Sequence, residues 1–161
     1  MMAVGASNEL PENDSLNALW DRFMIRVHVD YIEDDNVMVS YLRDFDPVKA
    51  NKRLKKARIT IKEVQRAQED VKALPIPDRV LDMLVMLRNK LKRVAIPVSD
   101  RRMRKCLRVM QASAYLRGRD TVAATDIHCL VNVLWDKPEQ RETIDEEVVT
   151  VINPHLSLIH I

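Results

Sequence analysis

The stretch VGASNELPENDSLNALWDRFMIRVHV, residues 4–29, decides how the first part of the chain is expected to fold. Small residues lead into Ser7 and Asn8, polar side chains of the kind found where a buried strand leaves a sheet. Pro11 and the polar residues after it predict a turn, and apolar residues at helical spacing then predict a short helix. Residues 24–29 alternate between apolar and polar side chains and predict a strand. This order indicates a small remnant of an α/β domain.

The chain after an acidic hinge at residues 31–36 predicts helices and no strand of useful length. Apolar side chains repeat every three or four residues in four segments, residues 61–74, 80–91, 100–117 and 122–135. One more short helix is expected towards residue 151, from a capping pair at Thr143 and Glu146. The fold class expected is therefore mainly α, a helical bundle preceded by the α/β remnant.

The signals at the helix ends agree with these boundaries. Thr60 and Glu63 form a capping box, in which each side chain bonds an unpaired backbone N–H. Ser99 or Asp100 is suited to cap the helix that follows, and Gly118 is suited to end it in the left-handed conformation. We divide the chain into an α/β remnant at residues 1–33, a helical module at 34–136, and a linker and tail at 137–161. A chain beginning near residue 34 is then expected to behave better than the full chain.

Composition sets further limits. The chain has 161 residues, of which 47% are hydrophobic, enough for one domain with a sizeable core. Cys106 and Cys129 lie far apart and show no metal-ligand spacing, so we expect two reduced core thiols and no metal site. Neither a membrane-spanning stretch nor a secretory leader is evident, and the cytoplasm is the compartment expected. The final residues 156–161, LSLIHI, resemble translated cloning sequence and are left out of the fold prediction.

Positive charge is concentrated in two places, although the net charge is only +2. Six basic residues lie within residues 49–58, where a solvated connector is the simpler interpretation and a phosphate-binding patch the alternative. A second basic group at residues 101–108 occupies the first half of a predicted helix, the end at which the helix dipole favours acidic residues. These arginines either have a function or pair with acidic residues on neighbouring helices.

Three separated motifs resemble one known family. They are GASNELP followed by DRF near the start, VSDRRMRKCLRVMQASAYLRGRD at residues 98–120, and LVNVLW at residues 130–135. In this order they are similar to the C-terminal part of AAA+ ATPases of the MoxR type, with the closest resemblance to the regulatory ATPases called RavA. The resemblance implies that the helical module is an AAA+ lid. Only Gly5 and Gly118 occur, so the phosphate-binding loop GxxxxGK[ST] is absent.

The resemblance also implies roles for four residues. Asn8 corresponds to sensor 1, whose amide can donate to a phosphate and accept from the attacking water. Arg22 corresponds to the arginine finger, expected to act on the nucleotide of a neighbouring subunit, because a guanidinium offers forked donors. Sensor 2 corresponds to Arg101 or Arg102, of which only one can face the nucleotide, since adjacent helical residues point about 100° apart. We favour Arg101 and expect Arg102 to face solvent.

Each role has a structural alternative. Asn8 could be an Asx-turn residue, and Arg22 could form a salt bridge to Asp21 or Asp14. Arg26 is the less suitable finger because it lies inside the predicted strand. His128 is interpreted as a structural residue and not as a ligand.

The function expected is that of a MoxR-type AAA+ ATPase that couples ATP hydrolysis to remodelling of partner proteins. ATP and Mg²⁺ would bind the complete protein, in a homo-oligomeric ring that is expected to be a hexamer. The 161-residue chain alone is expected to bind no nucleotide tightly and to hydrolyse none. The alternatives are a helical nucleic-acid-binding module, whose DNA binding would depend steeply on salt, and a protein-interaction domain without nucleotide chemistry. Nucleic acid is not an expected partner.

Overall fold

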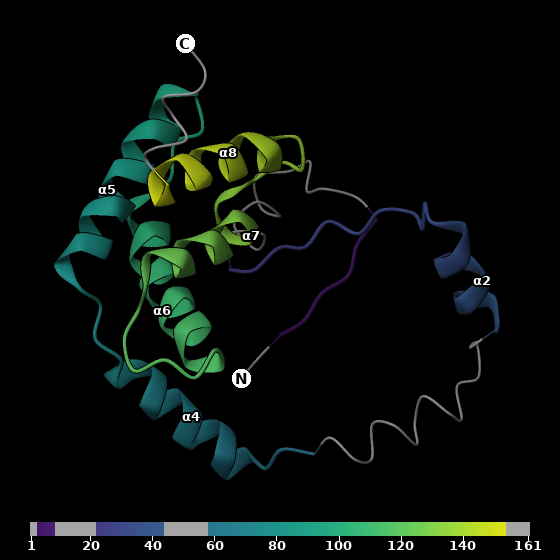
Figure 1. The fold of residues 1–161 in the computed structure, drawn as a ribbon, viewed down its shortest axis with the longest axis horizontal. Coiled ribbons are helices and arrows are strands. Elements are labelled where there is room, and N and C mark those ends of the chain that lie inside the picture. Colours follow the sequence, from purple (N-terminus) through teal and green to yellow (C-terminus); the bar gives the residue numbers. More distant parts are fainter. Residues whose placement is uncertain (1–2, 9–21, 44–57, 154–161) are drawn as a thin grey trace. The chain divides into compact units, whose positions relative to one another are not determined.

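The computed structural model describes residues 3–8, 22–43 and 58–153. Its helices in chain order are α2 Asp35–Arg43, α4 Ile61–Ala73, α5 Asp78–Arg93, α6 Asp100–Leu116, the 3₁₀ helix η1 Ala124–Leu130, α7 Val131–Leu134 and α8 Gln140–Ile152 (Figure 1). No strand occurs within these described ranges. The mainly α-helical fold expected from the sequence is confirmed.

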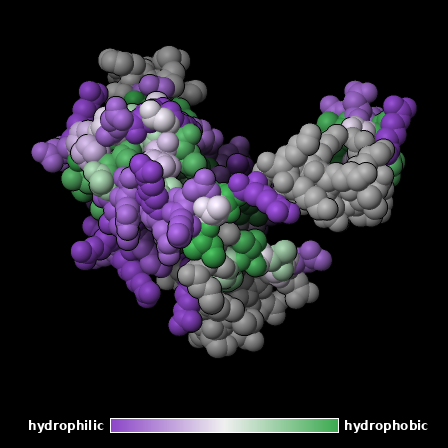
Figure 2. Space-filling model, turned by 90° about the horizontal axis from the view of Figure 1, so that it is seen from below, coloured by the Kyte–Doolittle hydropathy of each residue, from purple (hydrophilic) through white to green (hydrophobic). Residues whose placement is uncertain are grey.

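Contacts divide the chain into two units, one of residues 1–27 with 70–161 and the other of residues 28–69. In the first unit, α5 packs on α8, α6 packs on η1, and α8 also contacts η1 and α7, so these elements enclose a common interior (Figure 1). The largest fully buried side chains come from all of these elements: Leu87, Leu91, Met110, Ile127, Leu130, Leu134 and Ile144. The apolar stripes of the sequence therefore form one core. On the face seen in Figure 2, hydrophilic side chains cover much of this unit.

Helices α5 and α6 end in the same backbone motif. At the end of α5, Ile96 donates its N–H to the Leu91 carbonyl and Ala95 donates to Lys92, while Ala95 takes a φ of 60°. This pair of bonds is a Schellman motif, which is normally built on glycine. At the end of α6 the residue in the left-handed conformation is Gly118, with a φ of 67°, as the sequence predicts.

The start of α6 is also as expected. The Ser99 hydroxyl accepts a hydrogen bond from the Arg102 N–H at 3.2 Å, which satisfies one of the unpaired amides of the first turn. Asp100 in the same turn forms an ion pair with Arg88 of α5 at 2.5 Å. This capping fixes which way the side chains of the first turn of α6 point.

Three expectations about secondary structure are wrong. Residues 24–29 form no strand, because a strand requires a paired neighbour and Arg26 instead donates its N–H to the Asn132 carbonyl of α7 at 2.7 Å. Residues 122–135 are not one helix, since η1 runs into the short α7. The last helix begins at Gln140 and not near Thr143. The short helix expected near the start of the chain lies mostly at residues 9–21, outside the described part.

The region predicted as linker and tail is also different within its described part. Ile144, Val148 and Val151 of α8 are buried in the core, because they recur at helical spacing on one face. Residues 140–152 therefore belong to the packed module. The boundary proposed between residues 33 and 34 stays a prediction.

The unit of residues 28–69 consists of α2 and most of α4 in its described part. Asp34 starts α2 by accepting from the N–H groups of Asn36 and Val37. The predicted capping box at the start of α4 is confirmed: Thr60 donates its N–H to Glu63 at 2.7 Å, and Glu63 donates its N–H to the Thr60 hydroxyl. Neither helix has a buried residue. Of the basic run at residues 49–58, only Arg58 is described, and it is exposed.

The search for membrane-spanning segments, restricted to the residues that the structure describes, finds no helix of the length and apolarity that a bilayer crossing requires.

Candidate functional site: two arginines on one carboxylate

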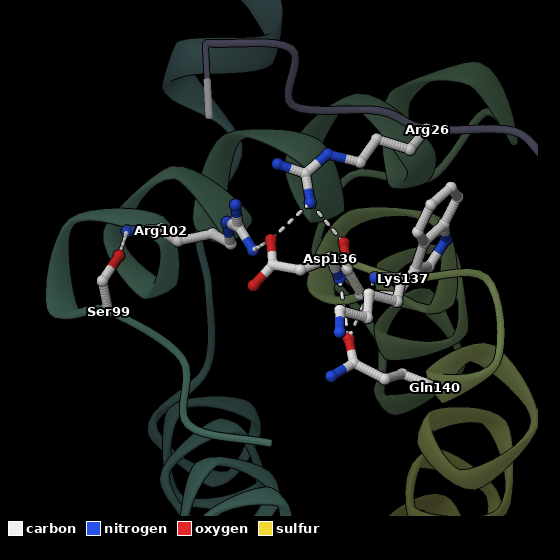
Figure 3. A network of polar contacts seen from close by, with 7 residues as sticks. Arg26, Ser99, Arg102, Asp136, Lys137 and Gln140 are labelled. Carbon is white, nitrogen blue, oxygen red and sulfur yellow. Dashed lines mark hydrogen bonds and ion pairs between the residues drawn. The ribbon is translucent and has the colours of Figure 1, made fainter. Parts of the chain in front are cut away.

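A group of three charged side chains lies at the first turn of α6 and just after α7 (Figure 3). Here one oxygen of Asp136, Oδ1, accepts from Arg102 at 2.7 Å and from Arg26 at 2.8 Å. The same guanidinium nitrogen of Arg26 donates to the Trp135 carbonyl. Two positive charges and one negative charge thus meet at one atom, and residues far apart in the sequence are brought together.

Each arginine is held at its backbone and at its guanidinium group. Arg102 lies in the first turn of α6, whose start is set by Ser99, and its side chain is buried. Arg26 is held twice, by its backbone bond to Asn132 and by its side chain on Asp136, and only 4% of its surface is exposed. Its neighbours Ile25 and Val27 are both largely exposed. Arg26 therefore anchors this short segment on the helices.

The backbone around Asp136 is set by the start of α8. The Gln140 side-chain oxygen accepts the N–H of Asp136 at 2.9 Å and the N–H of Lys137 at 3.1 Å. These bonds hold the turn between α7 and α8, and Pro138 lies within that turn. The carboxylate is thereby aimed at the two guanidinium groups (Figure 3).

The charges around Asp136 favour its ionised form. Partial burial on its own would raise the pKa of Asp136, but hydrogen bonds from Arg102 and Arg26 and the attraction of both guanidinium charges outweigh it and lower the pKa below its usual value. The Asp136 side chain is 55% exposed, whereas those of the two arginines are buried. Solvent therefore reaches the carboxylate from the side opposite the arginines.

The structure gives the four residues singled out in the sequence different surroundings. Asn8, Arg22 and Arg101 are exposed. The expectation that Arg102 faces solvent is wrong, because its side chain is buried on Asp136. Arg101 and Arg102 point apart, as adjacent helical residues must. Asn8 and Arg22 are not among the residues that bind Asp136.

Sequence reasoning missed two members of this site. The sequence makes Arg26 the less suitable finger because it lies in a predicted strand, although a basic residue among apolar ones is itself a reason to look for a partner. Asp136 comes directly after the LVNVLW motif, and its local sequence carries no signal of a role. The alternative that basic residues of α6 pair with acidic residues from other elements is correct for Arg102. Arg108 instead donates to Gln111 of its own helix at 2.8 Å.

A second polar cluster joins the end of α6 to η1 and has a structural explanation. The fully buried Asp126 accepts from the Ser113 hydroxyl at 2.9 Å, from Arg119 at 2.8 Å and from the Ala123 N–H at 2.9 Å. Three donors satisfy a carboxylate that would otherwise be costly to bury. This cluster closes the loop between α6 and η1.

The two thiols are free, as expected. Cys106 is buried and Cys129 is half-buried. Burial raises the pKa of Cys106 to about 12 and that of Cys129 to about 11, so both stay protonated near neutral pH.

Comparison with known proteins agrees with this architecture. Residues 79–148, which include α6, Asp136 and all of α5 but its first residue, match the model of the AAA lid domain. Residues 1–69 match the model of the MoxR domain in the MoxR-vWA-beta-propeller ternary systems. The helical bundle is thus an AAA+ lid. The chain belongs to the MoxR-type AAA+ ATPases.

Two curated relatives come from Methanocaldococcus jannaschii. The uncharacterized protein MJ0079 is 30% identical over 151 residues, which are 94% of this chain and 38% of that protein. The uncharacterized protein MJ0812 is 28% identical over 152 residues, which are 92% of this chain and 38% of that protein. The chain therefore spans less than half the length of the curated relatives it matches.

Proposed function

We propose that this chain supplies the lid and part of the nucleotide site of an ATPase that couples ATP hydrolysis to the remodelling of partner proteins. The observation that carries the proposal is the contrast between the adjacent arginines at the start of α6. Arg102 is committed to Asp136, whereas Arg101 is exposed on a helix start that Ser99 caps. An always-charged guanidinium held on a rigid helix suits a phosphate oxygen.

In this proposal Arg101 is sensor 2 and reports bound ATP to the lid. Asn8 orients the attacking water as sensor 1, and Arg22 is the finger that reaches the nucleotide of a neighbouring subunit. Both are exposed, which such roles require. ATP with Mg²⁺ would supply the reacting phosphate and its counter-charge, and the three residues would position charge around it.

The proposed partners are further subunits in a ring, expected to be a hexamer, and a client protein. The matched family takes its name from ternary systems that combine MoxR with vWA and beta-propeller proteins. We infer that proteins of those two kinds are the first to test as partners. The likeness to RavA-type regulatory ATPases and a cytoplasmic location belong to the same proposal.

The first test uses the 161-residue chain itself in calorimetry against ATP and Mg²⁺. The expected result is no hydrolysis and a dissociation constant of about 1 mM or weaker, about 4 kcal/mol of binding at most, because the phosphate loop is absent. Micromolar binding would contradict the assignment of the phosphate site. DNA binding with a steep salt dependence would favour the nucleic-acid alternative.

The second test concerns Arg101 and Arg22 in a complete parent ATPase that contains the phosphate loop. Arg101→Ala should weaken ATP-driven closure of the lid, measured by fluorescence, while the matched exposed variant Arg104→Ala should leave it unchanged. Arg22→Ala should leave ATP binding intact and lower hydrolysis by up to about 10³- to 10⁵-fold, the scale of arginine fingers.

An experiment that mixes two inactive variants decides whether Arg22 acts between subunits. One protein carries Arg22→Ala and the other lacks its water-activating carboxylate but keeps Arg22. Activity should return in mixed rings, because some interfaces then join an intact pocket to an intact finger. If mixed rings form and stay inactive, the role of Arg22 between subunits is refuted.

A further inference from the structure

Two segments with proposed nucleotide-site residues meet at the Asp136 carboxylate. Arg26 lies four residues after Arg22, and Arg102 directly follows Arg101. Both Arg26 and Arg102 donate to the same oxygen, at 2.8 and 2.7 Å (Figure 3). The two segments are more than 70 residues apart in the chain, so this carboxylate gives them a common reference point.

We propose that Asp136 is a positioning residue that sets the segment carrying Arg22 and the helix start carrying Arg101 relative to each other. This inference rests on the proposed function for its consequence in catalysis, but the coupling between the segments stands on the contacts alone. Asp136 itself does not touch the nucleotide. If each arginine had a separate acceptor, a displacement of one segment would not be transmitted to the other through this contact.

The arrangement favours positioning over simple stabilisation. Apolar side chains of similar size are often as good as a buried ion pair for stability, whereas polar and ionic groups are known in several systems to specify one arrangement. Here the acceptor is itself held from behind, because Gln140 binds the Asp136 and Lys137 amides. Arg26 is also held by Asn132 and Arg102 by the Ser99 cap. Each member of the group thus has its own support, and the shared oxygen links them.

The contacts predict reciprocal effects between the two sides. If Arg26 is replaced by Met, which keeps an apolar stem, the Arg102 guanidinium should move on Asp136 although Arg102 is unchanged. Its side-chain ¹H–¹⁵N signal in the full chain should therefore shift. If Arg102 is replaced by Met, protection of the Arg26 amide from hydrogen exchange should fall, on the order of tenfold. If the Arg26–Asp136 and Arg102–Asp136 contacts were independent of each other, replacing one arginine would leave the signals of the other unchanged.

Asp136→Asn should both shift the Arg102 side-chain signal and lower the protection of the Arg26 amide. Asp136→Glu should restore part of that protection. The matched control is Glu147→Gln, which breaks the Lys90–Glu147 ion pair of 2.8 Å between α5 and α8. That variant should change neither the Arg102 signal nor the Arg26 amide. Because the Met variants test the coupling separately, failure of Asp136→Asn to fold would leave the proposal testable.

The catalytic consequence is measured in the complete parent ATPase that contains the phosphate loop. Asp136→Asn should lower kcat about 10- to 100-fold, the cost of misplacing site residues, with a change of less than about threefold in the KM for ATP. Absence of reciprocal effects in the full chain would overturn the coupling. Reciprocal effects combined with unchanged ATP hydrolysis by the Arg22→Ala variant would instead refute the proposed function and leave the coupling intact.

Discussion

The helices of this chain fall into two kinds that the sequence hardly distinguishes. Helices α5, α6 and α8 have an apolar face and bury it, whereas α2 and α4 have apolar residues of similar spacing and no buried side chain. In the unit of residues 28–69, Val37, Tyr41 and Leu42 of α2 are all more than half exposed. The difference teaches that capping and periodicity are sufficient to predict a helix but not to predict what it packs against.

The test with the largest expected effect shortens one apolar side chain in each kind of helix. Leu87→Ala in α5 should lower the free energy of unfolding by about 2–5 kcal/mol, because the fully buried side chain leaves a cavity. Val64→Ala in α4, where the side chain is 38% exposed, should change it by less than about 0.5 kcal/mol. Denaturant titration of both variants measures the difference. Equal losses would mean that α4 packs as tightly as α5.

The next test addresses the two helix ends inside the packed module. Gly118→Ala places a Cβ on a residue with φ of 67° and meets no atom within 4 Å, so the cost is backbone strain, about 1–2 kcal/mol. Ala95→Gly should have the opposite sign, a gain of up to about 1 kcal/mol, because it relieves the same strain at φ of 60°. Thermal unfolding of the two variants should shift in opposite directions. Destabilisation by Ala95→Gly would show that chain entropy outweighs the strain.

A smaller effect is expected where residues 22–27 meet the helices. Because the pKa of Asp136 is lowered in the folded chain, its contribution to stability is complete above the unfolded value, near 3.8, and is lost as pH falls through the folded value. The effect is modest because solvent screens this half-exposed group. Unfolding measured from neutral pH to pH 2 should be less pH-dependent in Asp136→Asn than in the unchanged chain. Identical pH profiles would refute this contribution.

The smallest global effect is expected at the start of α4. Thr60→Ala removes the hydroxyl half of the capping box, so exchange of the amides in the first turn should increase. The cooperative unfolding transition should stay where it is, because no residue of α4 is buried in the core. Amide exchange and circular dichroism report the two effects separately. A shift of the cooperative unfolding transition would mean that α4 unfolds together with the packed module.

The contacts of Arg26 also change one expectation about truncation. A chain that begins near residue 34 was expected to improve on the full chain, since residues 4–29 would otherwise leave apolar faces exposed. Arg26 and the partly buried Met24 instead pack on the helical module. Such a truncation removes a partner of Asp136, and we now expect it to lower stability.

The sequence by itself determined the helical class, the capping of α4 and α6, the glycine at the end of α6 and the family. These features depend on residues close together in the chain, such as Ser99 with Arg102 or Thr60 with Glu63, so local spacing is sufficient to predict them. The residues proposed for sensor 1 and the arginine finger also came from sequence alone, and they remain proposals.

Tertiary structure alone decided which of the basic residues are paired. Sequence spacing predicts a strand residue at Arg26 and a solvent-facing Arg102, because their common partner Asp136 is 110 and 34 residues away. It also decided that α8 belongs to the core and that residues 24–29 form no strand. The physical reason is the same in each case: burial and ion pairing depend on neighbours that are distant in sequence, whereas helix starts and ends are decided within one turn.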